Sequence, residues 1–144
     1  MIWFLLNKMI FASGIHFTLL SSYVPSLSFS LNFGERFCTE FVSGGFETND
    51  WGTFYTGVRL YLVYRERKFG KFSLRLYNGA GGGFRRDKNV GEGLGGEFFF
   101  GFKIRYKKLQ KIYFVTDFGI RVSPASAVDM PYRPAIGGGA FIEW

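Results

Sequence analysis

Hydrophobic and polar side chains alternate along most of the chain beyond residue 34. The stretch from Gly96 to Lys108 shows the pattern most clearly. Its even-numbered positions from Phe98 to Tyr106 are all apolar or aromatic, whereas the odd-numbered positions are mostly charged, small or polar. Successive side chains leave a β-strand on opposite faces, so a period of two predicts a strand with one apolar and one polar face.

The same period predicts six clear strands and therefore an all-β protein. They cover residues 36–46, 53–66, 71–82, 96–107, 111–122 and 133–144. No segment of comparable length has the 3.6-residue period of an amphipathic helix. Tight connections at 67–71 and 107–111 alternate with longer ones at 85–93 and 123–134. This alternation predicts an antiparallel up-and-down (meander) β-barrel, in which turns of one kind share one end.

The two faces of the predicted sheet differ in chemistry. One face is large and aromatic, and it includes Phe98, Phe100, Phe102, Phe114 and Phe118. The other face carries glycine, tyrosine and charges of both signs, namely Glu40, Arg59, Arg75, Glu97, Lys103, Arg105, Asp117, Arg121 and Glu143. In a narrow barrel, small residues make room and opposite charges can pair in a confined polar interior. We therefore expect the phenylalanines to face lipid and the charged side chains to plug the lumen.

The first thirty residues differ from the rest, because they are apolar and carry a single charge, at Lys8. The apolar run after Lys8 ends near Leu20, which is short for a membrane-spanning helix and typical of a secretory signal peptide. Ser28 and Ser30 place small side chains where a signal peptidase cleaves. We expect residues 1–30 to be a signal peptide and residues 31–144 to form a single β-barrel domain. A strand over 26–33 and a structural N-terminal helix are the alternatives.

The last strand carries a more specific signal. The chain ends at Trp144, with Ile142 two residues and Gly139 five residues before it. This resembles the C-terminal strand signal that the insertion machinery reads in bacterial outer-membrane barrels, although Gly137 replaces the usual polar residue. Together with the pattern of 34–144, the chain resembles small barrels of the OmpA-transmembrane-domain and OmpX kind.

That resemblance implies an outer-membrane location and at least eight strands. Six strands are clear, so the expected number is six to eight. Three interpretations remain open: a strand hidden in the N-terminal thirty residues, an incomplete member of the family, or a soluble sheet domain.

Composition narrows the possible chemistry. The net charge of +7 permits nucleic acid, anionic lipid or lipopolysaccharide as a partner, but no nucleic-acid-binding motif is present, so we expect none. The single cysteine, Cys38, excludes an intrachain disulfide. The single histidine, His16, lies in the expected signal peptide, so a mature chain would lack histidine-dependent catalysis and a zinc site. We expect no cofactor and no metal.

Basic residues flank the tight turns and occupy the longer loop. They are Arg65, Arg67, Lys68, Lys71, Lys107, Lys108 and Lys111 at the turns, and Arg85, Arg86 and Lys88 in the loop. At the ends of a lipid-facing band such side chains can meet phospholipid or lipopolysaccharide phosphates. The sequence thus predicts a monomeric, non-enzymatic outer-membrane β-barrel with a structural, adhesive or surface-interaction role. The alternative is a soluble, secreted, lipocalin-like barrel that binds an apolar ligand with the phenylalanines inside.

Overall fold

The computed structural model describes residues 9–19, 24–34, 36–50, 52–88, 91–122 and 132–144. No helix in these ranges is long and apolar enough to cross a membrane. The strands are β1 (Met9–Leu19), β2 (Val24–Phe33), β3 (Phe37–Glu47), β4 (Gly52–Val63), β5 (Arg67–Phe69), β6 (Phe72–Asp87), β7 (Gly91–Tyr106), β8 (Ile112–Val122) and β9 (Tyr132–Glu143).

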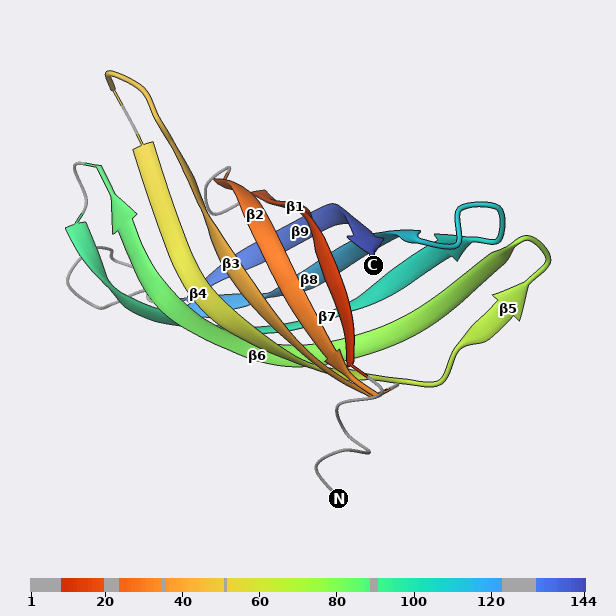
Figure 1. The fold of residues 1–144 in the computed structure, drawn as a ribbon. Helices are drawn as coiled ribbons and strands as arrows, with labels where there is room; N and C mark the ends of the chain where they lie inside the picture. Colours follow the sequence, from red (N-terminus) through yellow and green to blue (C-terminus); the bar gives the residue numbers. More distant parts are fainter. Residues whose placement is uncertain (1–8, 20–23, 35, 51, 89–90, 123–131) are drawn as a thin grey trace.

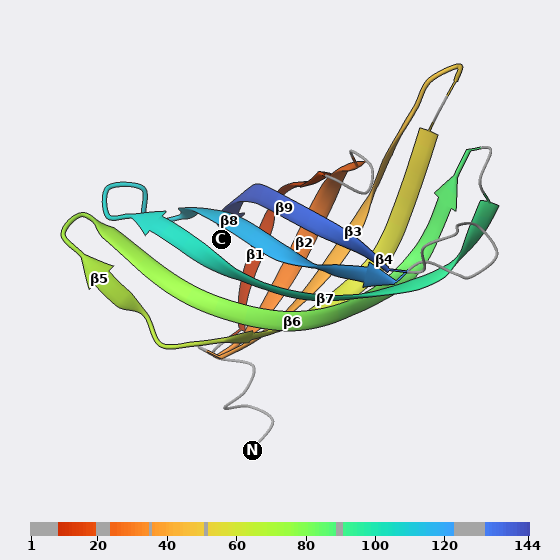
Figure 2. The ribbon, with the colours of Figure 1, turned by 180° about the vertical axis from the view of Figure 1, so that it is seen from behind.

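These strands form one antiparallel sheet that closes on itself. Each long strand pairs with the next long strand in the sequence, and β1 pairs with β9 to close the sheet. The short β5 lies between β4 and β6 in the sequence only, because β4 pairs directly with β6. Figures 1 and 2 show the resulting wall curving around an interior. β5 continues β4 along β6 after a bulge, because four steps from Val63 to Arg67 oppose three steps from Tyr77 to Leu74. The fold is a closed eight-stranded meander barrel.

The register fixes how far the strands tilt. Paired residues can be followed once around the barrel from Met9 through Phe33, Phe37, Leu62, Asn78, Phe100, Phe118 and Ile136. The path returns to β1 at Leu19, ten residues from its start. A shear of ten in eight strands corresponds to a tilt of roughly 40°, so each residue rises roughly 2.5 Å along the barrel axis.

The barrel has two different ends. The tight connections at 34–36, 70–71 and 107–111 lie together with the C-terminal residue at one end, which we call the turn end. Gly70 supports one of these turns with a φ of 55°, a conformation that other residues rarely adopt. The hairpins β3–β4 and β6–β7 project at the opposite end, which we call the tip end.

The N-terminal segment contributes to the wall. The strand alternative for residues 26–33 is present as β2, and the strand that the sequence pattern did not reveal is β1. His16 therefore lies in a barrel strand, although its side chain is outside the described residues. The signal peptide over 1–30 stays a prediction about processing. Cleavage after Ser30 would remove β1 and most of β2 from the wall. The exclusion of histidine chemistry depended on that cleavage.

One predicted loop is wrong. Residues 85–93 were expected to form a long polar connection, but β6 extends to Asp87 and β7 begins at Gly91, with Arg85 paired to Gly93. Near the tip of this hairpin the outward row carries the charged pair Arg86 and Glu92 instead of apolar residues, which hides the strands from a pattern of apolar positions. The other expected long connection, 123–134, lies mostly outside the described residues.

Candidate functional site

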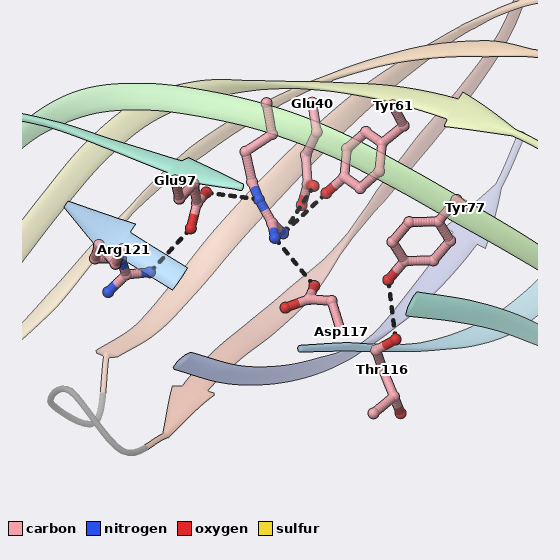
Figure 3. Close-up of polar contacts among 8 residues, drawn as sticks. Glu40, Tyr61, Tyr77, Glu97, Thr116, Asp117 and Arg121 are labelled. Atoms are coloured by element: carbon pink, nitrogen blue, oxygen red, sulfur yellow. Dashed lines mark hydrogen bonds and ion pairs between the residues drawn. The ribbon is translucent and has the colours of Figure 1, made fainter. Parts of the chain in front are cut away.

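The interior of the barrel is organised around Arg59 on β4. Its Nε atom lies 2.8 Å from Glu97 Oε1 on β7, and its Nη2 atom lies 3.1 Å from Asp117 Oδ2 on β8. Its Nη1 atom lies 3.5 Å from Glu40 Oε2 on β3. Glu97 also accepts a 3.3 Å hydrogen bond from Arg121 Nη2. Figure 3 shows these side chains converging from opposite walls of the barrel.

Aromatic side chains complete the surroundings of Arg59. Its guanidinium carbon lies 3.9 Å from the centre of the Phe99 ring, and Nη1 donates a 2.9 Å hydrogen bond to the Tyr61 hydroxyl. Tyr77 packs against Tyr61 and donates to the carbonyl oxygen of Thr116 at 3.2 Å. The cation is therefore held by carboxylates at its edge and by an aromatic ring on its face.

The central charges balance. Among the described residues, three acids and three arginines are buried: Glu40, Glu97, Asp117, Arg59, Arg85 and Arg121. A buried charge is tolerated when a partner of opposite sign and further hydrogen bonds compensate for lost water. Arg85 was missed as an interior residue because the sequence pattern placed it in a loop. Arg85 and Tyr77 are both odd-numbered residues of β6, so they share the inner face of that strand. Extending the alternation of β6 to residue 85 would have identified Arg85 as an interior residue.

A second group of charges lies nearer the turn end. Lys103 Nζ is 2.9 Å from Glu143 Oε1 and 3.4 Å from the centre of the Tyr113 ring, and Arg105 also pairs with Glu143. Arg75 was expected in the same network. The structure instead places it at the turn end, about one-third exposed, with its nearest acid Glu66 3.8 Å away. The predicted lumen residues thus form two clusters and one separate, weakly paired arginine.

Glycines on the inner face make room for the interior aromatic rings. A Cβ atom at Gly79 would lie 2.6 Å from Phe99 Cζ, and one at Gly101 would lie 2.7 Å from the Tyr77 hydroxyl. Real Cβ atoms do not approach other heavy atoms this closely, so a larger residue would displace the ring or the strand. The mid-strand glycines of the polar face are therefore part of how the interior is filled.

Small cavities lie between the described interior side chains. One of about 10 Å³ is lined by Tyr55, Arg85, Glu97 and Arg121 among others. Another, of about 40 Å³, lies between the two charge clusters and is lined by Cys38, Glu40 and Lys103 among others. A cavity needs roughly 10–15 Å³ to hold one water molecule, so these spaces hold a few waters at most. Glu40 Oε1 has no hydrogen-bond partner among the residues that the structure describes, and a water molecule in this space would satisfy it.

The predicted lipid-facing residues lie on the outer face. Phe98, Phe100 and Phe114 are exposed, with Phe98 67% accessible. Phe102 and Phe118 are half-buried between neighbouring side chains, and the rings of Phe100 and Phe118 are 5.8 Å apart. This orientation is the reverse of a soluble barrel, which keeps such residues inside.

The predicted C-terminal signal lies on β9 and just beyond it. Ile142 and Trp144 are exposed on the outer face. Trp144 Nε1 donates a 3.2 Å hydrogen bond to Ser13 Oγ on β1, and its ring lies 6.4 Å from that of Phe29. Gly139 is half-buried in β9 between Val115 and His16 of the neighbouring strands. Trp144 therefore contacts the seam where the two ends of the chain pair.

The described residues contain no group of histidine, cysteine and acidic side chains placed to hold a metal ion. Cys38 is half-buried and not in a disulfide. The described part of the interior is thus a set of paired charges.

No protein-family model matches the sequence, and no match was found among curated proteins. Solved structures do match. The N-terminal β-barrel domain of Pseudomonas aeruginosa OprF superposes with a TM-score of 0.62 at 7% identity, covering 95% of this chain and 98% of that one. Neisserial surface protein A superposes with a TM-score of 0.56 at 8% identity, covering 94% and 96%. The chain therefore has the fold of the small outer-membrane β-barrels that its sequence pattern resembles.

Proposed function

We propose that this protein resides in the outer membrane as a non-conducting, non-enzymatic barrel with a structural or surface-interaction role. One observation carries the proposal: among the described residues, the exposed face is phenylalanine-rich, while six charged side chains are buried inside. Lipid is the solvent that makes this arrangement favourable. A lipocalin-like barrel would need an apolar interior to hold its ligand, so the same observation disfavours that alternative.

The exposed aromatic residues support a membrane position. Tyr64 and Phe69 are exposed near the turn end, and Phe46 and Phe54 are exposed near the tip end. Ten residues separate Phe54 from Tyr64 along β4 and its continuation, which corresponds to roughly 25 Å along the axis. That matches the apolar band of about 25 Å between aromatic girdles in outer-membrane barrels.

The interior supports a plugged barrel. Arg59 bridges acids from three other strands, and its contacts cross the lumen (Figure 3). Moving an ion through this section would require these pairs to separate inside a confined space. We therefore propose that the closed lumen serves stability and that interaction with other molecules occurs at the ends and the outer face, where lipids, lipopolysaccharide and the insertion machinery are the expected partners.

The location is tested by extracting the protein from cell envelopes. We expect release by detergent and not by salt, together with faster gel migration before heating than after. Release into the soluble fraction without heat-modifiable migration would contradict the proposal. Conductance across planar bilayers tests the plug separately: we expect no steady channel current, and a stable open channel would show that the lumen conducts.

A further inference from the structure

Cationic side chains gather at the turn end of the barrel. They are Arg36, Arg65, Arg67, Lys68, Lys71, Lys107, Lys108 and Lys111, and all of them are exposed. Among the described side chains outside the lumen, the acid at this end is Glu66, which is half-buried near Arg75. The sequence adds Glu35, which lies outside the described residues. This end is therefore strongly positive.

The tip end is different. Its described outward side chains include the cations Arg86 and Lys88 and the acids Glu47, Asp50 and Glu92. Lys88 Nζ lies 3.2 Å from Glu47 Oε1. Cations and acids are nearly balanced there, and the buried central cluster is balanced as well. Among the described side chains, the excess positive charge is thus concentrated at the turn end.

The position of these cations identifies the layer that they occupy. Phe37, Phe69, Phe72 and Leu109 are exposed beside them, at the turn-end limit of the apolar outer face. In a membrane barrel, aromatic residues at this limit lie at the lipid–water interface. The cations beyond them therefore lie in the headgroup layer, where phosphate groups are the abundant anions.

We propose that the turn end is a docking surface for anionic phospholipid headgroups. The inference rests on the proposed outer-membrane location and adds the lipid class and the leaflet. The longest connection in the sequence, 123–131, follows the tip end of β8, and outer-membrane barrels carry their longer loops on the outside. The turn end is therefore periplasmic, and the leaflet concerned is the inner one. Phospholipids with a net negative headgroup gather around this end in preference to zwitterionic ones, and the preference weakens as salt screens the charges.

Trp144 provides a local reporter. It is exposed on the outer face, and the backbone N–H of Glu143 beside it donates a 2.7 Å hydrogen bond to the carbonyl oxygen of Lys111. Replacing Trp3 and Trp51 by phenylalanine leaves Trp144 as the single tryptophan. The full chain is folded into phosphatidylcholine vesicles containing a minor share of phosphatidylglycerol. Bromine is placed on the acyl chains of one lipid or the other, and quenching of Trp144 is compared.

We expect phosphatidylglycerol to be enriched about fivefold around Trp144 at low salt, which is the effect of one cation–headgroup contact of ordinary strength. The enrichment factor of phosphatidylglycerol over phosphatidylcholine should fall toward 1 in K107Q/K108Q/K111Q and at high salt. It should stay at the parent value in the tip-end control R86Q/K88Q. Equal quenching by the two lipids in the parent protein at low salt would overturn the proposal. Heat-modifiable migration in pure phosphatidylcholine vesicles is measured in parallel, because failure to fold there would contradict the membrane location itself and this inference with it.

Discussion

Asp117→Ala tests whether the interior charges are held away from water. Asp117 is buried on β8, and its Oδ2 atom lies 3.1 Å from Arg59 Nη2. Removing it leaves the buried cluster with three arginines and two acids. Breaking a buried ion pair by removing one partner costs about 3–5 kcal/mol. Because Arg59 keeps Glu97 at 2.8 Å and Glu40 at 3.5 Å, we expect a loss at the lower end, about 3 kcal/mol.

The assay is denaturant unfolding of the refolded barrel in detergent or lipid, followed by circular dichroism. Glu47→Ala is the matched control, because Glu47 pairs with Lys88 at 3.2 Å but its side chain is 73% exposed. An exposed pair contributes about 0–1 kcal/mol, so the control should change the free energy of unfolding little. If Asp117→Ala also costs less than about 1 kcal/mol, the interior is hydrated and the plugged-lumen reasoning is refuted.

Three further substitutions test separate parts of the account. Gly79→Ala should destabilise the barrel by about 1–3 kcal/mol, because the new Cβ atom would lie 2.6 Å from the Phe99 ring. Gly82→Ala is the control, because its Cβ atom would meet its nearest atom at 3.4 Å, and it should be neutral or slightly stabilising in the same unfolding assay. Trp144→Glu should lower the yield of folded protein in the outer membrane while Trp144→Phe retains it, and equal yields would remove the role of the terminal aromatic. Phe100→Arg should cost about 2–4 kcal/mol in lipid, and Phe69→Arg at the turn end about 0–1 kcal/mol; equal effects would argue against a lipid-facing band.

Much of the fold follows from the alternation of side chains alone. The strands over 36–46, 111–122 and 133–144 agree with β3, β8 and β9 within a residue or two, because their apolar and polar rows are distinct. β1 was missed because glycine, serine and alanine interrupt its apolar residues, and a run of apolar residues near the start of a chain also fits a signal peptide. Periodicity cannot separate these two interpretations. In the structure these residues form β1, which closes the sheet by pairing with β9.

The interior was predicted in composition but not in arrangement. Alternation assigns Glu40, Arg59, Glu97 and Asp117 to one face, and the structure brings all four together. Which acid meets which base depends on the shear of the barrel, and the shear depends on the register of every hairpin. A prediction from strands taken one at a time therefore could not separate the Arg59 cluster from the Glu143 cluster, or place Arg75 outside both.

The orientation of the two faces is the central claim, and neighbouring positions on β7 test it most directly. Tryptophan is introduced at Phe100, which is exposed, or at Phe99, which is buried, in a chain whose three natural tryptophans are replaced by phenylalanine. Each protein is folded into vesicles of lipid brominated near the centre of the acyl chains. The account predicts strong quenching of tryptophan at position 100 and little at position 99. Quenching at position 99 with none at position 100 would show that the phenylalanine face points inward and would contradict the membrane barrel.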